Sequence, residues 1–277
     1  MKRIIVPIDF SEQSEFALEA AANLAHKYGS ELIVLHMLEL SNAILTTNGT
    51  AINEEAVFYL KLAEQKFEAF LNKPYLEDLK ITPIVKHFKV FSEVNDVANK
   101  HEANLIVMGS HGASGVKEVL VGSNTEKVVR HSDVPVLVIK HSPILLDFEK
   151  GVFASDFSDD AIKPYLNAKT TFKKLGAKMH LVYVNSPDGN FKSTSEIDKK
   201  VSLFLKKADG DLENLKDVNI VSDYSIEKGI LNFANDIGAD LIAVATHGRK
   251  GLAHFFEGSI SEDIANHSTL PVMTFKI

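Results

Sequence analysis

Short apolar runs alternate along this chain with segments in which apolar residues recur at helical spacing. Runs cover residues 2–8 and 32–37, and Leu18 and Leu24 lie on one face of the helix expected between them, from Ser11 to Gly29. Further runs end near residues 87, 108 and 139, with helical segments between them. Strands that are apolar throughout are typical of a parallel sheet covered on both faces. The pattern therefore predicts a doubly wound α/β fold.

The same order of strands and helices returns in the second half of the chain. The stretch 104–123, NLIVMGSHGASGVKEVLVGS, recurs as DLIAVATHGRKGLAHFFEGS at 240–259, and Asp9 recurs as Asp156. We predict two tandem domains, residues 1–142 and 148–277, with a linker near residues 141–150. The second copy is shorter between Val184 and Ala245. We expect the two domains to differ most in that interval.

Each copy of the recurring stretch places glycines between a strand and a helix. The first follows the pattern G-x2-G-x9-G-S, and Ser123 with Glu126 predicts a capping box at the start of the helix. Bare backbone N–H groups and a helix N-terminus together favour an anion. The stretch therefore suggests phosphate binding. In the second copy Ala245 replaces Gly109.

The strand, the glycine loop and a following strand that opens with Val134-Pro135 or Leu270-Pro271 resemble the universal stress protein family. The resemblance covers both halves. It implies two five-stranded parallel sheets with strand order 3-2-1-4-5 and helices on both faces. It also implies a regulatory protein of the stress response that binds ATP, with or without Mg²⁺.

The resemblance also implies which residues bind the nucleotide. Asp9 and Met37 match positions that hold the adenine end of ATP, while the ribose and phosphates would contact Gly109, Gly112, Gly122 and Ser123. We assign four neighbours to the same site: Pro7, Met108, His111 and Asn124. The second site would comprise Asp156, Val184, Gly248, Gly258 and Ser259, with Arg249 within reach of phosphate. Because a methyl group at Ala245 is expected to obstruct the ligand or a left-handed backbone, we expect the first site to bind ATP better.

Structural readings of the same residues stay open. Asp9 could satisfy backbone N–H groups of a turn, Ser123 could act as a helix cap alone, and the glycines could serve packing. His111 and His247 stand in a polar loop, where histidine is more often solvated than catalytic. We assign no catalytic residue and no metal site, because the histidines show no recognisable ligand spacing.

Composition excludes several other classes of protein. The 277 residues carry a net charge of −7 and include no cysteine, which excludes disulfides and thiolate chemistry. The chain lacks a G-x4-G-K-[ST] motif, a G-x-G-x-x-G turn after the first strand and a G-x-S-x-G elbow. We expect neither nucleic acid nor membrane as a partner, and a cytoplasmic location.

The leading hypothesis is therefore an ATP-binding regulator with at most slow ATP hydrolysis and with protein partners that the sequence does not identify. The alternatives are a slow nucleotide hydrolase or nucleotidyl-type enzyme on the same fold, and a scaffold that binds no nucleotide. We expect the two domains to pair through strands 134–139 and 270–275 as an intrachain pseudo-dimer. Each of these strands is apolar and opens with a proline, which suits a sheet edge. Further homodimerisation is compatible with this arrangement.

Overall fold

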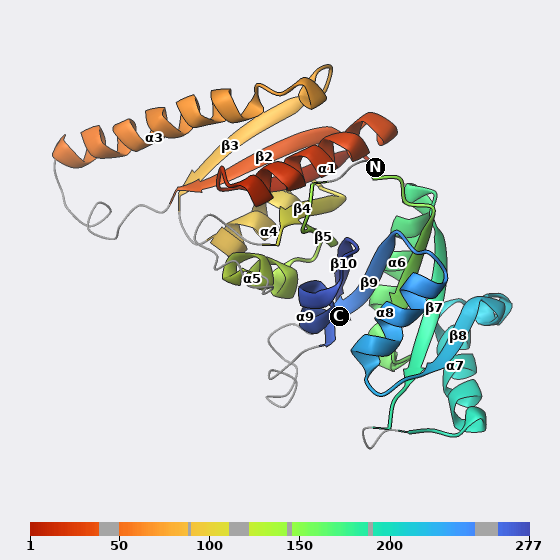
Figure 1. The fold of residues 1–277 in the computed structure, drawn as a ribbon. Helices are drawn as coiled ribbons and strands as arrows, with labels where there is room; N and C mark the ends of the chain where they lie inside the picture. Colours follow the sequence, from red (N-terminus) through yellow and green to blue (C-terminus); the bar gives the residue numbers. More distant parts are fainter. Residues whose placement is uncertain (39–49, 88–89, 111–121, 143–145, 188–190, 247–259) are drawn as a thin grey trace. The chain divides into compact units, whose positions relative to one another are not determined.

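The computed structural model describes residues 1–277 except 39–49, 88–89, 111–121, 143–145, 188–190 and 247–259 (Figure 1). The chain divides into two compact units, Met1–Leu146 and Asp147–Ile277.

The first unit is built around a parallel sheet. Its elements are β1 (Arg3–Ile8), α1 (Glu12–Tyr28), β2 (Glu31–Leu38), α3 (Thr50–Leu71), the 3₁₀ turn η1 (Pro74–Leu76), β3 (Ile81–His87), α4 (Val90–Lys100), β4 (Leu105–Gly109), α5 (Ser123–His131) and β5 (Val136–Ile139). The strands lie in the order β3-β2-β1-β4-β5 and all pair in parallel. The order reverses at β1, which has β2 on one side and β4 on the other.

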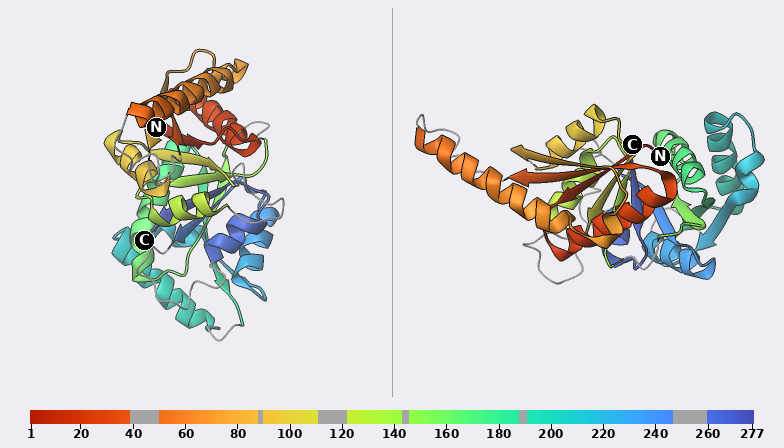
Figure 2. Two further views of the ribbon diagram at one scale, coloured as in Figure 1. Left: turned by 90° about the vertical axis from the view of Figure 1, so that its left-hand side faces the viewer. Right: turned by 90° about the horizontal axis from the view of Figure 1, so that it is seen from above.

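Helices cover both faces of this sheet. Side chains of Ile5, Ile33 and Ile106 form one buried cluster with Val97 of α4 and Val128 of α5. Residues on either side of Ile5 in β1 point to the opposite face, where α1 packs over β1 and β4. Figure 2 shows α1 and α4 on opposite sides of the sheet of this unit. Burial on both faces explains why the strands are apolar throughout.

The second unit repeats the arrangement. Its elements are β6 (Lys150–Ala154), η2 (Asp159–Ala161), α6 (Ile162–Leu175), β7 (Lys178–Asn185), α7 (Thr194–Ala208), η3 (Glu213–Asp217), β8 (Val218–Ser222), α8 (Ile226–Asp236), β9 (Leu241–Thr246), α9 (Ile260–His267) and β10 (Val272–Lys276). The strand order is β8-β7-β6-β9-β10, the counterpart of the order in the first unit. The predicted α/β fold with parallel sheets is confirmed.

Local signals placed the first helix well. Ser11 is the N-cap of α1 and its side chain accepts a hydrogen bond from the N–H of Ser14, while Gly29 ends the helix at φ 62°. Both features were predicted from residue type. Elsewhere the predicted bounds are wrong by two residues: β5 and β10, expected from residues 134 and 270, begin after Pro135 and Pro271.

The predicted linker is too long at its carboxyl end. Phe148 is 2% exposed and therefore belongs to the core of the second unit. The carboxylate of Asp240 accepts hydrogen bonds from the N–H groups of Glu149, at 2.6 Å, and Lys150, at 2.7 Å. These bonds fix residues 149–150 at the start of β6.

Candidate functional site

The carboxyl ends of three neighbouring strands converge in the first unit. Ile8 of β1 is in register with His36 of β2, so Asp9 comes level with Met37. Ile5 is in register with Ile106 of β4, which brings Gly109 level with Ile8. Ligands of open parallel sheets bind at the carboxyl ends of strands, where the order reverses. Pro7, Asp9, Met37, Met108 and Gly109 therefore lie together at such a switch point.

The turn after β1 holds Asp9 at the surface. Asp9 is exposed, and its Oδ1 accepts hydrogen bonds from the N–H of Ser11, at 3.0 Å, and from the Ser11 hydroxyl. The intervening Phe10 is left-handed, with φ 64°. This conformation is costly for a residue with a bulky side chain, and backbone strain of this kind tends to collect at functional sites.

Aromatic packing holds the strained turn from the α1 side of the sheet. The ring of Phe10 lies 4.4 Å from that of His36 and 5.6 Å from that of Phe67, between centroids. His36 Nδ1 is 3.0 Å from the carbonyl oxygen of Ile8, which can only accept, so Nδ1 carries the proton. Burial lowers the pKa of His36 below its usual value, against the opposing effect of that hydrogen bond. The neutral ring of His36 thus packs against Phe10, the residue that follows Asp9.

Gly109 is a glycine because α1 approaches it closely. A Cβ placed there would lie 2.6 Å from the carbonyl oxygen of Gln13 in the first turn of α1. Its φ is not in the left-handed region. The reason for glycine is thus contact between a strand and a helix rather than a special backbone angle. Without this glycine α1 could not begin beside the end of β4.

Hydrogen bonds tie the start of α5 to the end of β4. The N–H of Gly122 donates a hydrogen bond to the carbonyl oxygen of Ser110 at 2.7 Å. The buried hydroxyl of Thr125 donates one to the carbonyl oxygen of Gly109 at 2.8 Å. The first turn of α5, with exposed Ser123 and Asn124, is therefore fixed next to the strand ends. A helix start in this place offers backbone N–H groups and a favourable dipole to an anion.

The capping-box prediction for α5 is wrong. Gly122 is the N-cap, with extended φ −62° and ψ 146°, no side chain caps the helix, and Ser123 is its first residue. Glu126, the expected partner of the cap, pairs instead with Arg130 at 2.5 Å. The bond from Gly122 to Ser110 draws the chain into the helix one residue earlier than the serine signal suggested.

The second unit repeats the strand-end arrangement with changes. Ala154 is in register with Val182, so Asp156 comes level with Val184, and Ala245 stands level with Ser155 as Gly109 does with Ile8. Asp156 Oδ1 accepts from the N–H of Ser158 at 3.0 Å, and Phe157 between them has φ 54°. The turn D-F-S is thus built in the same way in both units.

The helix that follows this turn begins differently in the second unit. In the second unit the chain enters through the 3₁₀ turn η2, without a side-chain cap at Ser158, before α6 begins at Ile162. The change in the opening turn accompanies a methyl group at Ala245. We expected this methyl group to obstruct the ligand. Its counterpart Gly109 instead provides space for a helix, so glycine at that position has a reason other than access of a ligand.

Some predicted residues lie outside the described part of the chain, and several features were missed. The former are His111, Gly112, Gly248, Arg249, Gly258 and Ser259. The repeated D-F-S triplet was visible in the sequence, but nothing in it signals a left-handed phenylalanine. Lys200 of α7, whose Nζ is 3.7 Å from Asp156 Oδ2, carried no sequence signal either.

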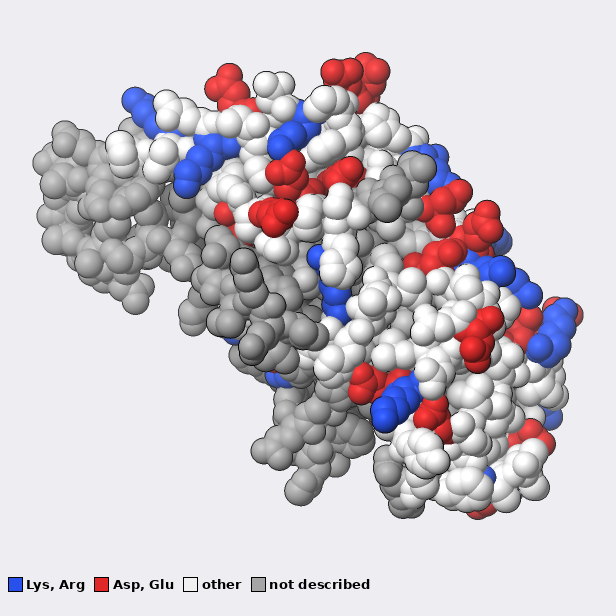
Figure 3. Space-filling model, in the orientation of Figure 1, with Lys and Arg blue, Asp and Glu red and all other residues white. Residues whose placement is uncertain are grey.

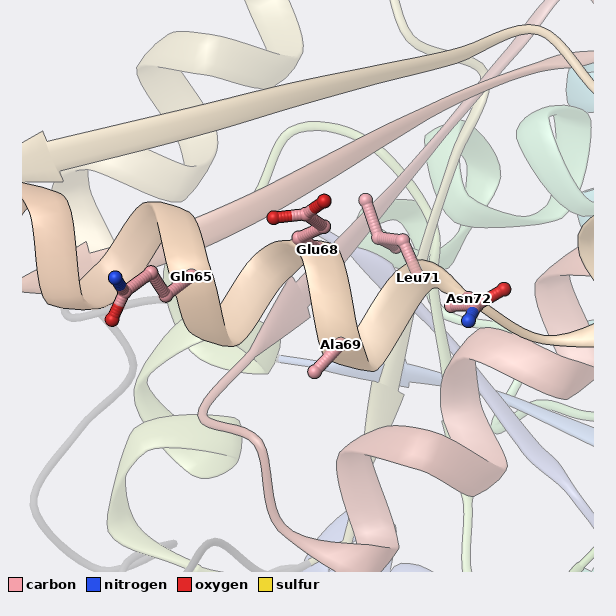
Figure 4. Close-up of a pocket in the computed structure, with 5 residues that line it drawn as sticks. All are labelled: Gln65, Glu68, Ala69, Leu71 and Asn72. Carbon is pink, nitrogen blue, oxygen red and sulfur yellow. The ribbon is translucent and has the colours of Figure 1, made fainter.

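Two pockets among the described residues lie elsewhere. One, of about 700 Å³, is lined by Gln65, Glu68, Ala69, Leu71 and Asn72, all from α3 and its end (Figure 4). The other, of about 480 Å³, lies by the amino ends of β1 and β2, where Arg3 and Lys80 already pair with Glu31. Glu31 of the second pocket is thus already paired, and neither pocket includes a strand's carboxyl end. The strand-end cluster remains the better candidate.

The described surface offers little else of one chemical kind. On the face shown in Figure 3, acidic and basic side chains are interspersed. Among the described residues no cluster of three histidine or acidic side chains could hold a metal ion. In the same part of the chain no helix is long and apolar enough to cross a membrane.

The fold and the cluster of residues at the strand ends describe a tandem α/β protein with a candidate ligand site where the strand order reverses in each unit. The sequence model of the universal stress protein family matches residues 1–140 and 148–276, so the chain belongs to this family. Universal stress protein MJ0577 of Methanocaldococcus jannaschii is 32% identical over 153 residues, half of this chain and 94% of that protein. YxiE of Bacillus subtilis is also 32% identical, over 151 residues, half of this chain and 98% of its own.

A solved structure matches both repeats together. The crystal structure of a universal stress protein from Archaeoglobus fulgidus is 27% identical and covers 99% of this chain and 96% of its own, with a TM-score of 0.64. The tandem organisation is therefore shared with a known member of the family.

Proposed function

We propose that this protein binds an adenine nucleotide, ATP with or without Mg²⁺, and regulates other proteins in the stress response according to whether the site is filled. The observation that carries the proposal is the convergence of Asp9, Met37 and Gly109 at the switch point of the first sheet. Membership of the universal stress protein family supports the choice of ligand.

The described side chains suit the adenine end of such a ligand. The exposed carboxylate of Asp9 can accept a hydrogen bond from the exocyclic amino group of adenine. Met37 is partly buried and packs against the apolar cluster of the α4 face, so its thioether can contact an aromatic ring. Together they offer one polar and one apolar contact at adjacent strand ends. This combination is typical of small-molecule sites.

The phosphate end would lie towards α5. Its first turn is fixed beside β4, and exposed Ser123 and Asn124 add polar side chains to the N–H groups there. A bound phosphate would use those N–H groups and the dipole of the helix. Among the described residues of this site no side chain is a positioned base, so we propose binding rather than rapid turnover.

Mass spectrometry of small molecules released from the purified, denatured protein tests this proposal. We expect an adenine nucleotide, and we expect the emptied protein to take up ATP in titration calorimetry. ATP recovered intact after hours of incubation supports a regulator, whereas product formed well above a buffer control supports the hydrolase alternative. Absence of both a released nucleotide and a binding isotherm would leave the scaffold reading.

We also propose that the two units pair through β5 and β10. Each is the last strand in the order of its own unit and is apolar. A sheet edge of this kind is expected to be covered. Strands paired as a pseudo-dimer run antiparallel, so Lys140 and Lys276, at their carboxyl ends, should lie about one strand length or roughly 15 Å apart and be joined within a single chain by a lysine-reactive cross-linker of that reach. Cross-links from Lys140 that consistently exclude Lys276 would argue against the pairing.

A further inference from the structure

A lysine of the second unit occupies the position where its aspartate would meet a ligand. Lys200 projects from α7, and its Nζ lies 3.7 Å from Asp156 Oδ2 and 6.0 Å from the ring centroid of Tyr183. The other carboxylate oxygen of Asp156, Oδ1, is already bonded to the N–H of Ser158. Both oxygens of this carboxylate therefore have partners within the chain.

The corresponding helix of the first unit carries a small residue at this point. Phe67 of α3 meets Phe10 edge-to-face, with rings 84° apart, and Phe204 of α7 meets Phe157 at 88°. These matching contacts align the two helices. One turn before Phe67 stands Ala63, which is 2% exposed, and one turn before Phe204 stands Lys200. At this aligned position only the second unit has a lysine, whereas the first unit has Lys66 of α3 near its own turn, with Nζ 5.7 Å from the ring centroid of Phe10.

We propose that Lys200 is a specificity-determining residue of the second unit: it competes with a nucleotide for the Asp156 carboxylate and so weakens adenine-nucleotide binding at that site. The inference rests on the proposed function. A nucleotide that uses the Asp156 carboxylate must first displace the ammonium group, and it must do so beside α8. A Cβ placed on Gly229 of that helix would lie 2.6 Å from Val184 Cγ1, so the helix already packs against the residue level with Asp156.

The competition is expected to be modest. Lys200 and Asp156 are partly exposed, with side-chain exposures of 31% and 63%. Exposed ion pairs are worth about 0.2–1 kcal/mol, which corresponds to about a 1.4-fold to 5-fold change in affinity. Removal of the lysine should therefore tighten the second site by a factor in that range.

Titration calorimetry with ATP on the full chain tests the inference through Lys200→Met, which keeps the apolar stem. The matched control is Lys207→Met on the same helix, which removes the same charge but pairs with Asp159 at 2.7 Å. We expect Lys200→Met to bind ATP more tightly at its weaker site than Lys207→Met does, or to gain a second measurable site. The gain should vanish when both variants are compared in an Asp156→Ala background.

The outcomes separate this inference from the proposed function. Equal isotherms for Lys200→Met and Lys207→Met, in a protein that does bind ATP, would overturn the role of Lys200 alone. A gain that persists in the Asp156→Ala background would overturn it too, because the lysine would then act without its partner. Absence of binding in the unmodified protein and in every variant would contradict both proposals.

Discussion

Asp9 combines two tasks that a single substitution can separate. Its Oδ1 holds the turn by accepting from Ser11, and its negative charge lies on an exposed side chain at the strand end where we propose that a ligand binds. Asparagine keeps an oxygen for the turn but removes the charge. The structural role of Asp9 in the turn is therefore compatible with ligand binding, since the hydrogen bond to the turn is present and the side chain is still exposed.

Asp9→Asn should weaken ATP binding without lowering the melting temperature. Loss of a charge-assisted hydrogen bond costs about 1.5–3 kcal/mol, or roughly tenfold to a hundredfold in affinity. Titration calorimetry and thermal unfolding measure the two effects, with Asp156→Asn as the matched control in the second unit. A lowered melting temperature with unchanged affinity would reduce Asp9 to a turn residue.

Among the elements of the first unit, the packing of α1 against β4 determines how closely α1 approaches the candidate site. Gly109 is in direct contact with the backbone of Gln13, and backbone atoms cannot move aside as the end of a side chain can. The second unit has Ala245 at the corresponding position, and its chain enters α6 through a 3₁₀ turn. The same residue position therefore carries different constraints in the two units.

Gly109→Ala should destabilise the full chain by about 1–3 kcal/mol, the usual cost of forcing a methyl group into a packed contact. Urea denaturation measures the loss. The reciprocal Ala245→Gly should cost less than about 1 kcal/mol, since it only adds backbone freedom. Equal stability of Gly109→Ala and the unmodified protein would mean that α1 can shift away from β4 freely.

The first turn of α5 separates stability from binding in a similar way. Ser123 is exposed and does not cap the helix, whereas Thr125 is buried and bonds to Gly109. Ser123→Ala should therefore leave the melting temperature unchanged. It should weaken ATP binding roughly tenfold to a hundredfold if the hydroxyl donates a charge-assisted hydrogen bond worth about 1.5–3 kcal/mol to phosphate.

Thr125→Val provides the contrast for Ser123→Ala. It leaves the Gly109 carbonyl without the hydroxyl as its partner and should lower the melting temperature. A loss of stability in Ser123→Ala, with ATP binding intact, would contradict the assignment of Ser123 to the ligand.

At the scale of the whole molecule, the sequence revealed the repeat and the fold class because both depend on patterns that survive divergence. Apolar strands, Gly29 and the Ser11 cap each act through neighbours in the chain. The same reasoning missed the contact of Lys200 with Asp156 and the left-handed Phe10 and Phe157, because these depend on residues brought together by folding. The start of α5 was missed for the same reason, since Ser110 sets it.

The expected difference between the two units stays a prediction, but its physical basis has changed. Ala245 was expected to obstruct the second site, yet its counterpart glycine serves helix packing. Lys200 beside Asp156, and α8 against Val184, now provide the reasons for weaker binding in the second unit. Both are contacts between elements that no local sequence signal reports.

Methionine methyl NMR tests whether the nucleotide binds at the strand ends of the first unit. The chain has five methionines, and two of them, Met37 and Met108, stand at the proposed strand ends. Met179 lies near the amino end of β7 and serves as an internal control. Signals in the full chain labelled at methionine methyls are assigned by Met→Leu substitutions. On titration with ATP the signals of Met37 and Met108 should shift and saturate together, while the signal of Met179 stays in place. Saturable ATP binding that leaves the signals of both Met37 and Met108 unmoved would contradict a nucleotide site at these strand ends.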